Sequence, residues 1–272
     1  MRIAISNIAW DVSEDEKISE LLSKYQIDAI DIAPSKYFPD PINTTDKDIT
    51  KVKSFWTTKG FEISGMQSLL FGTQGLNIFG SKESQRIILD HLSAIARIAE
   101  GLGVKRLVFG SPKNRDRADL SDEQTLNIAK EFFTKLGNIA LKYEVIFCLE
   151  PNPRCYGANF MTTSRETLDI VLAINHPSIK MQLDTGAITI NNESITDILT
   201  HSQNLIGHIH ISEPNLIVVG DGDTDHKNYA KAIKTHIDNP LISIEMVATQ
   251  NELHINSIER ATAFVTNIYR KS

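Results

Sequence analysis

The chain has few cysteines and no long hydrophobic run. Cys148 and Cys155 are the only cysteines among 272 residues. Two are too few for a disulfide framework, and Cys148 lies in an apolar run where a buried, reduced thiol is expected. No apolar segment approaches the roughly 18–20 residues that cross a bilayer, and MRIAISNIAWD at the N-terminus lacks the layout of a signal peptide. These features predict a cytoplasmic protein without membrane contact.

The chain also lacks any excess of positive charge. It carries 28 lysines and arginines against 34 aspartates and glutamates, a formal net charge of −6, and the basic residues are scattered among acidic ones. Proteins that bind nucleic acid usually present a basic patch, because much of their affinity comes from neutralising phosphates. We therefore expect no nucleic-acid partner.

Short β-type runs and helical stretches alternate along the chain. The runs cover residues 2–6, 27–32, 61–67, 105–110, 145–150, 179–184, 205–211 and 241–246. We expect a helical stretch after each run, and the clearest cover 13–25, 81–103, 120–143, 163–175, 193–202, 225–237 and 251–271. Ser13 is suited to cap the first of these helices, and Ser121 with Gln124 matches a capping box.

This alternation predicts an α/β fold with parallel strands. Eight strand–helix units in 272 residues match a TIM (β/α)8 barrel, which typically takes about 250 residues. A doubly wound open sheet would usually place a glycine-rich loop after the first strand, but SNIAWD at 6–11 has no glycine. No low-complexity segment or linker divides the chain, so we predict a single barrel domain spanning residues 1–272.

Four potential metal ligands come from four consecutive strand ends. They are Glu150 in CLEPN, Asp184 in QLDTG, His210 in GHIHIS and Glu245 in SIEM. In a barrel these ends meet at one mouth. A buried carboxylate is costly unless it is paired or bound to a metal. A mostly oxygen ligand set predicts one divalent ion, either Mn²⁺, Mg²⁺ or Co²⁺, and Zn²⁺ is also compatible.

Further polar residues accompany this set. Strand alternation places His208 on the same face as His210 but one layer deeper, so we expect His208 to support the site. Gln182 shares a face with Asp184, and we expect it to help orient the site. We predict that six residues near the mouth bind the substrate: Gln67, Lys113, Arg115, Asn152, Arg154 and Tyr156.

Two of these predictions are more specific. Lys113 and Arg115 follow the fourth strand, where they would overhang the mouth and hold a phosphate or carboxylate. The loop VVGDGDTDHK at 218–227 is rich in glycine and aspartate. We interpret it as a mobile active-site loop in which Gly220 and Gly222 are the flexible points.

The sequence resembles the xylose isomerase-like TIM barrels, the sugar-phosphate isomerase and epimerase family that includes the ketose 3-epimerases. CLEPNP, LDTG, GHIHISEP and ISIEM fall in the order and at the spacing of that family, over essentially the whole chain. The resemblance implies one divalent metal held by Glu150, Asp184, His210 and Glu245. It also implies that Glu150 and Glu245 act as acid and base on a carbohydrate, and that the protein forms a homodimer or homotetramer.

The chemistry that the resemblance implies is proton abstraction beside a carbonyl. A metal that holds a carbonyl and a neighbouring hydroxyl acidifies the adjacent C–H and stabilises the resulting enediolate. Return of the proton to the opposite face gives an epimer, and return to the adjacent carbon gives an isomer. We therefore expect a metal-dependent sugar or sugar-phosphate isomerase or epimerase, and the sequence does not separate the two reactions.

The chain departs from the ketose 3-epimerases at three positions that contact free ketose in those enzymes. Tyr156 replaces a glutamate, Ala187 a histidine and Leu216 an arginine. The expected metal ligands thus match while the sugar-binding residues do not, which indicates a different substrate or a different activity.

Three other functions fit the same barrel. A metal-dependent sugar dehydratase would use the same ligands, and fold alone does not exclude it. A non-catalytic metal- or sugar-binding protein would not need both Glu150 and Glu245. A repair nuclease like endonuclease IV would need several more histidines, and the net charge of −6 also disfavours it.

Overall fold

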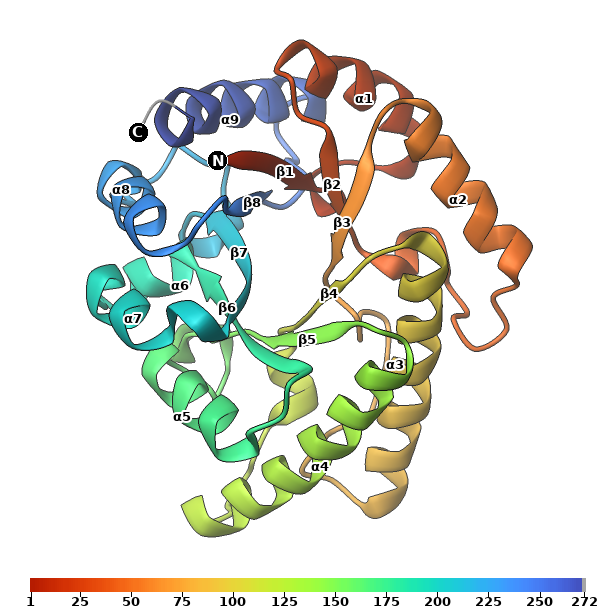
Figure 1. Cartoon of the computed structure of the whole chain (residues 1–272), viewed down its shortest axis with the longest axis vertical. Helices are drawn as coiled ribbons and strands as arrows, with labels where there is room; N and C mark the ends of the chain where they lie inside the picture. The colour runs from red at the N-terminus through yellow and green to blue at the C-terminus, as the bar shows by residue number, and fades with distance from the viewer. Residues whose placement is uncertain (271–272) are drawn as a thin grey trace.

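Eight parallel strands close into a barrel in chain order (Figure 1). The computed structural model describes residues 1–270. The strands are β1 (Arg2–Ser6), β2 (Ala29–Ile32), β3 (Glu62–Met66), β4 (Arg106–Phe109), β5 (Ile146–Leu149), β6 (Ile179–Asp184), β7 (Ile206–Ser212) and β8 (Leu241–Glu245). Because β1 pairs with both β2 and β8, the ring has no free edge. The predicted TIM (β/α)8 barrel is confirmed, and the open sheet is excluded.

Helices surround the barrel (Figure 1). They are α1 (Asp15–Lys24), α2 (Asp46–Thr58), α3 (Lys82–Leu102), α4 (Asp122–Lys142), α5 (Ser164–Ile174), α6 (Thr185–Ile190), α7 (Ile195–Ser202), α8 (His226–His236) and α9 (His254–Tyr269). Short 3-10 helices lie mostly in the loops: η1 (Asn7–Ala9), η2 (Val12–Glu14), η3 (Pro34–Lys36), η4 (Pro112–Arg115), η5 (Arg154–Tyr156), η6 (Gln203–Leu205) and η7 (Pro214–Leu216). The last helix, α9, packs beside α1 and so completes the outer ring.

The helices follow the amphipathic pattern of the sequence. In α3 the predicted stripe, which includes Ile88, Leu92 and Ile95, is buried against the barrel, and the helix ends at Gly103 with a left-handed backbone. In α4 the predicted capping box is present, because Ser121 and Gln124 exchange hydrogen bonds. The predicted stretch 251–271 corresponds to α9, although Lys271 lies outside the described residues.

The N-terminal cap predicted for the first helix was wrong. Ser13 lies inside η2, and α1 begins two residues later, at Asp15. The backbone N–H of Asp11 donates to Glu14 Oε2 at 3.0 Å, so an aspartate–glutamate pair begins the helical segment earlier than expected. We expected a helical stretch after the second strand but gave it no bounds. In the structure this helix is α2, which begins with a capping box formed by Thr45 and Asp48.

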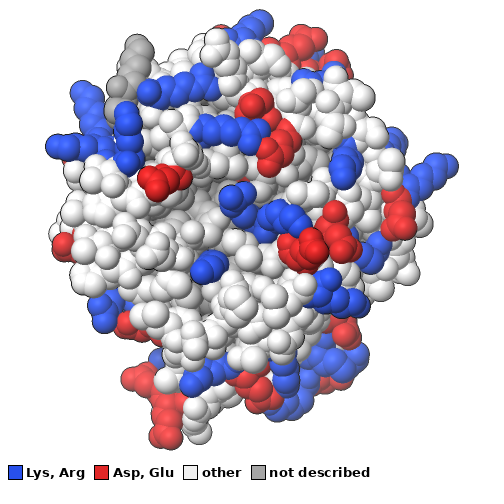
Figure 2. All heavy atoms as spheres, viewed as in Figure 1, with Lys and Arg blue, Asp and Glu red and all other residues white. Residues whose placement is uncertain are grey.

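The described surface carries mixed charge. On the face shown in Figure 2, lysine and arginine side chains are scattered among acidic ones over a largely uncharged surface. In residues 1–270, no helix is both long enough and apolar enough to span a bilayer.

Candidate active site

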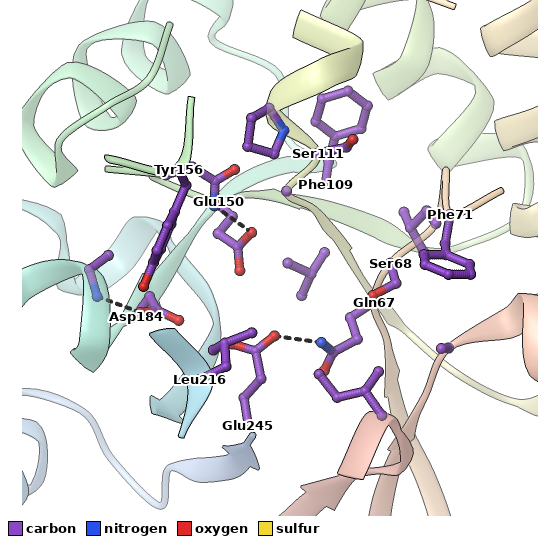
Figure 3. A pocket seen from close by; sticks show the side chains of 18 of the residues that line it. Gln67, Ser68, Phe71, Phe109, Ser111, Glu150, Tyr156, Asp184, Leu216 and Glu245 are labelled. Carbon is purple, nitrogen blue, oxygen red and sulfur yellow. Dashed lines mark hydrogen bonds between the residues drawn. The ribbon is translucent and has the colours of Figure 1, made fainter. Parts of the chain in front are cut away.

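The four expected ligands converge at the carboxyl ends of β5 to β8. One ligand atom from each of Glu150, Asp184, His210 and Glu245 lies within 4.8 Å of the others. His210 Nδ1 is 3.2 Å from Glu245 Oε2, 3.7 Å from Glu150 Oε1 and 4.0 Å from Asp184 Oδ2. Strand register accounts for part of this, since Asp184 and His210 are paired neighbours on β6 and β7. In Figure 3 the three carboxylates point toward a common space.

The electrostatics of this cluster fit a divalent cation. Burial raises the pKa of Asp184 to about 7, and the negative charges of Glu245 and Glu150 add to the effect. Burial alone would lower the pKa of His210, but Glu245 and Glu150 raise it well above its ordinary value. Neither ring nitrogen of His210 has a hydrogen-bond partner among the described residues. Crowded carboxylates around an unpartnered imidazole are the donor set that a divalent ion would satisfy.

Amide side chains hold the two glutamates in matching ways. Gln67 Nε2 donates to Glu245 Oε1, and Asn152 Nδ2 donates to Glu150 Oε2 at 3.0 Å. Each glutamate therefore keeps one oxygen bound by the protein and turns the other toward His210. Gly110 leaves room for this arrangement, because a Cβ there would lie 1.7 Å from Glu150 Oε2.

Asp184 is held in the same way as the two glutamates, with one carboxylate oxygen hydrogen-bonded to the protein. Its Oδ1 accepts hydrogen bonds from the Ala187 N–H at 2.7 Å and from Ser212 Oγ at 3.0 Å, which leaves Oδ2 facing His210. The role predicted for Gln182 in orienting this site stays a prediction. Gln182 is fully buried, but neither of its amide atoms has a hydrogen-bond partner within residues 1–270.

A buried aspartate that we did not predict lies behind His210. Asp31 Oδ2 is 2.7 Å from His208 Nε2 and 3.9 Å from His210 Nε2. Burial raises the pKa of Asp31, but His208 outweighs it and holds the pKa below the ordinary value. Gly65 makes the approach feasible, since a Cβ there would lie 2.6 Å from Asp31 Oδ1. The sequence signal was an acid inside the apolar strand AIDI. His208, which we predicted to support the site, contacts this residue.

A cavity of about 620 Å³ opens above the ligand cluster. Three of the six residues predicted to bind substrate line it: Gln67, Asn152 and Tyr156. Ala187 and Leu216 line it as well. All three positions at which the chain departs from the ketose 3-epimerases thus face the cavity.

The other three predicted substrate residues are not among the described residues that line the cavity. Lys113 and Arg154 are exposed outside it. Arg115 is 1% exposed, because η4 turns its side chain inward. Its guanidinium donates to the carbonyl oxygen of Glu150 at 2.8 Å and to Asn152 Oδ1. Arg115 therefore supports the end of β5, and its predicted role of holding a phosphate at the mouth was wrong.

Glu213 fixes the loop that follows β7. Its carboxylate, which also lines the cavity, accepts hydrogen bonds from the N–H groups of Gly220 and Thr224 and lies 2.9 Å from His226 Nε2. Gly222 permits this contact, since a Cβ there would lie 2.3 Å from Glu213 Oε2. The structure thus gives Gly222 a steric role, whereas the mobility that we predicted for the loop stays a prediction.

Comparison with known proteins identifies the family. The family model for the xylose isomerase-like TIM barrel matches residues 19–265. The chain belongs to this family. The resemblance noted in the sequence is confirmed.

Relatives of this family member include two D-psicose 3-epimerases. The protein from Ruminiclostridium cellulolyticum is 30% identical over 92 residues, which are 34% of this chain and 31% of the relative. The protein from Enterocloster bolteae is 26% identical over 100 residues, which are 37% of this chain and 33% of the relative. Each match spans about one third of the relative's length.

Solved structures share the fold over the full length. D-psicose 3-epimerase with D-tagatose from Clostridium cellulolyticum H10 has a TM-score of 0.81 at 19% identity, with 99% of both chains covered. IOLI protein with a binding zinc atom has a TM-score of 0.78 at 17% identity, with 100% of this chain and 99% of that chain covered. At such identities the likeness concerns the fold alone.

Proposed function

We propose that this protein is a divalent-metal-dependent epimerase or isomerase of a sugar or sugar derivative. The observation that carries the proposal is the meeting of three carboxylates around the unpartnered Nδ1 of His210 at the cavity floor. The names of the relatives, D-psicose 3-epimerases, support sugar chemistry for a chain of this family.

Glu150, Asp184, His210 and Glu245 would hold the ion. Mn²⁺, Mg²⁺ and Co²⁺ suit this mostly oxygen set, and Zn²⁺ is compatible, as it is bound in the IOLI structure. When bound, the ion supplies Lewis-acid stabilisation of negative charge that develops on the substrate oxygens.

The two glutamates would move the proton. The inward oxygen of one glutamate would take the proton from the carbon beside the carbonyl and end protonated. The other glutamate, which starts protonated, would donate its own proton and end ionised. Gln67 and Asn152 hold these two side chains in place, so neither has to reorient between the steps. Return to the opposite face of the same carbon inverts it, and return to the adjacent carbon gives the isomer.

Two wider properties belong to the same proposal. Cys148 and Cys155 are free cysteines, which supports a reducing, cytoplasmic setting. A homodimer or homotetramer stays a prediction, which light scattering on the purified protein would check.

The test is exchange of carbon-bound hydrogen with heavy water. The Mn²⁺-loaded protein is incubated with a panel of ketoses and aldoses, and deuterium incorporation is followed by NMR. We expect incorporation at the carbon beside the carbonyl, and we expect Glu245→Gln to reduce it at least about 100-fold, because the variant retains the shape of the side chain but lacks the base. Exchange that persists at the wild-type rate in Glu245→Gln would contradict the assignment.

A further inference from the structure

The cavity wall above the ligand cluster is largely apolar. Its apolar side chains include Ile8, Leu69, Leu70, Phe71, Leu216 and Val247. They come from loops after β1, β3, β7 and β8, and Figure 3 shows Phe71 and Leu216 at the edge of the space that the carboxylates share. Phe71 is 75% exposed and Val247 is 46% exposed. The apolar lining therefore continues to the rim.

Leu216 is held in this wall at a conformational cost. Its φ is +52°, in the left-handed region that leucine rarely adopts. The neighbouring backbone enforces this conformation, since the Leu216 N–H donates to the Glu213 carbonyl and the Val247 N–H donates to the Leu216 carbonyl, both at 3.0 Å. Glycine or asparagine would relieve the strain. The leucine side chain in this conformation lines the cavity.

Most polar side chains of the wall are already engaged by the protein. Lys36 Nζ donates to the carbonyl oxygens of Asn7, at 2.7 Å, and Trp10, which leaves one of its three protons. Ser111 Oγ donates to Asn114 Oδ1. These groups have little capacity left for the hydroxyls of a ligand.

Few hydrogen-bonding groups remain. The Tyr156 hydroxyl accepts from the Asn215 N–H at 2.6 Å but can still donate its own proton, and Gln67 keeps an unpartnered Oε1. Ser35 and Ser68 add two hydroxyls. This supply suits the reacting end of a sugar, but a buried hydroxyl without a partner is costly.

The charge of the lining disfavours an anionic substrate. Among the described residues that line the cavity, Lys36 is the only lysine or arginine, and it is tied to two carbonyls. The acids of the lining are Glu150, Asp184, Glu213 and Glu245. A phosphate group would therefore meet one engaged cation and several carboxylates, without the convergent donors that phosphate sites provide.

We propose that the substrate of this site is an uncharged hydroxycarbonyl compound whose end remote from the reacting carbons lacks hydroxyls, such as a 6-deoxyketose, and is not a sugar phosphate. This inference rests on the proposed function, because the reacting end must still reach the metal and the two glutamates. In this proposal Leu216 and Phe71, which both line the cavity, supply apolar surface to the part of the substrate that carries no oxygen.

Matched ligands test the inference. D-Fructose, D-psicose, D-tagatose and D-sorbose are each compared with their 6-deoxy and 6-phosphate forms. Affinity is measured by calorimetry on the Mn²⁺-loaded protein, and deuterium exchange is measured in parallel. An apolar pocket discriminates against an added hydroxyl by up to about 100-fold, so we expect the best 6-deoxy compound to bind about 10- to 100-fold more tightly than its parent and the phosphate to bind most weakly.

A pair of variants tests whether the apolar cavity wall causes the preference for the 6-deoxy form. Leu216→Asn is nearly isosteric, suits the left-handed backbone and introduces hydrogen-bonding groups; it should lower the preference for the 6-deoxy form about tenfold. Ile217→Asn changes the next residue, which is exposed and is not part of the lining, and should leave the preference unchanged.

The outcomes separate this inference from the proposed function. Tightest binding by a phosphate or a fully hydroxylated sugar overturns the inference even if exchange occurs. If the compounds bind in the expected order of affinity but show no deuterium exchange, the result supports the inference and contradicts the proposed function. Failure of every compound to bind overturns the inference as well.

Discussion

At the residue scale, the three carboxylates of the site share one arrangement. Each has one oxygen bonded to a protein donor and the other directed at His210. The protein thus fixes the direction of each ligand before any ion binds, which limits the reorganisation that binding would require.

Asp31 extends this arrangement behind His210. Loss of a carboxylate that supports a ligating histidine typically lowers metal affinity about 10- to 100-fold. Asp31 is hydrogen-bonded to His208 and lies 3.9 Å from His210 Nε2, so it acts on the His210 ring through its charge. We expect this loss of Mn²⁺ affinity in Asp31→Asn, measured by electron paramagnetic resonance on the folded protein. Asp28→Asn, an exposed neighbour of β2, is the control and should bind like the wild type. Wild-type affinity in Asp31→Asn would contradict the assignment.

The two thiols should differ in reactivity. Cys148 is fully buried, and burial raises the pKa of its thiol to about 12, whereas Cys155 is exposed beside Tyr156. Because the thiolate is the reactive form, we expect a disulfide reagent at pH 8 to label one thiol per folded chain and two after denaturation. Cys155→Ser should abolish labelling of the folded protein; rapid labelling of that variant would show that the region around Cys148 opens.

The sequence predicted which four candidate ligands converge, but not all of the residues that contact them. Glu150, Asp184 and Glu245 each close an apolar run and His210 lies near the end of another, so strand alternation and the barrel together predicted that they meet at one rim. Asp31 and Arg115 act through contacts between distant segments, 177 and 35 residues apart in the chain. Local patterns do not encode such pairings, and Arg115 was therefore predicted to bind substrate at the mouth, although its side chain is buried and donates to the carbonyl oxygen of Glu150.

At the element scale, the strands were predictable because each is a short apolar run between helical stretches. The helix boundaries were less predictable. Ser13 is a residue type that often caps helices, but a hydrogen bond between Asp11 and Glu14 begins the helical segment that leads into α1. The loops that shape the cavity depend on tertiary contacts. Glu213 holds the segment after β7 through contacts with Gly220, Thr224 and His226. No residue spacing in the sequence predicts these contacts.

Glu213 gives this loop a pH-dependent contribution to stability. Burial raises the pKa of Glu213, but bonds from His226 and Thr224 outweigh burial and lower it below the ordinary value. A carboxyl with a lowered folded-state pKa stabilises the protein fully above its unfolded pKa, and this stabilisation is lost as the pH falls through the folded value. We expect Glu213→Gln to lower the free energy of unfolding by about 1–3 kcal/mol at pH 7 and by progressively less below pH 4.5.

Urea unfolding of the metal-free protein between pH 7 and pH 3 measures this effect. Glu20→Gln, on the exposed face of α1, is the control and should match the wild type throughout. A difference between Glu213→Gln and wild type that is the same at every pH would contradict an ionised Glu213.

At the scale of the whole molecule, closure of the barrel brings the site together. The ligands lie within one rim although Glu150 and Glu245 are 95 positions apart, because β5 to β8 are neighbours in the ring. The fold class was predictable from the number and order of runs. The cavity was not, because its lining combines segments that follow all eight strands.

The central claim is that Glu150, Asp184, His210 and Glu245 form one divalent-metal site, and titration of the metal-free protein with Mn²⁺ tests it most directly. We predict one ion per chain, with a rise in the free energy of unfolding of about 2.7 kcal/mol at a free Mn²⁺ concentration 100 times Kd. Single substitutions Glu150→Gln, Asp184→Asn, His210→Gln and Glu245→Gln should each weaken binding, while Lys113→Gln should not. No bound ion, or binding that survives all four substitutions, would contradict the account.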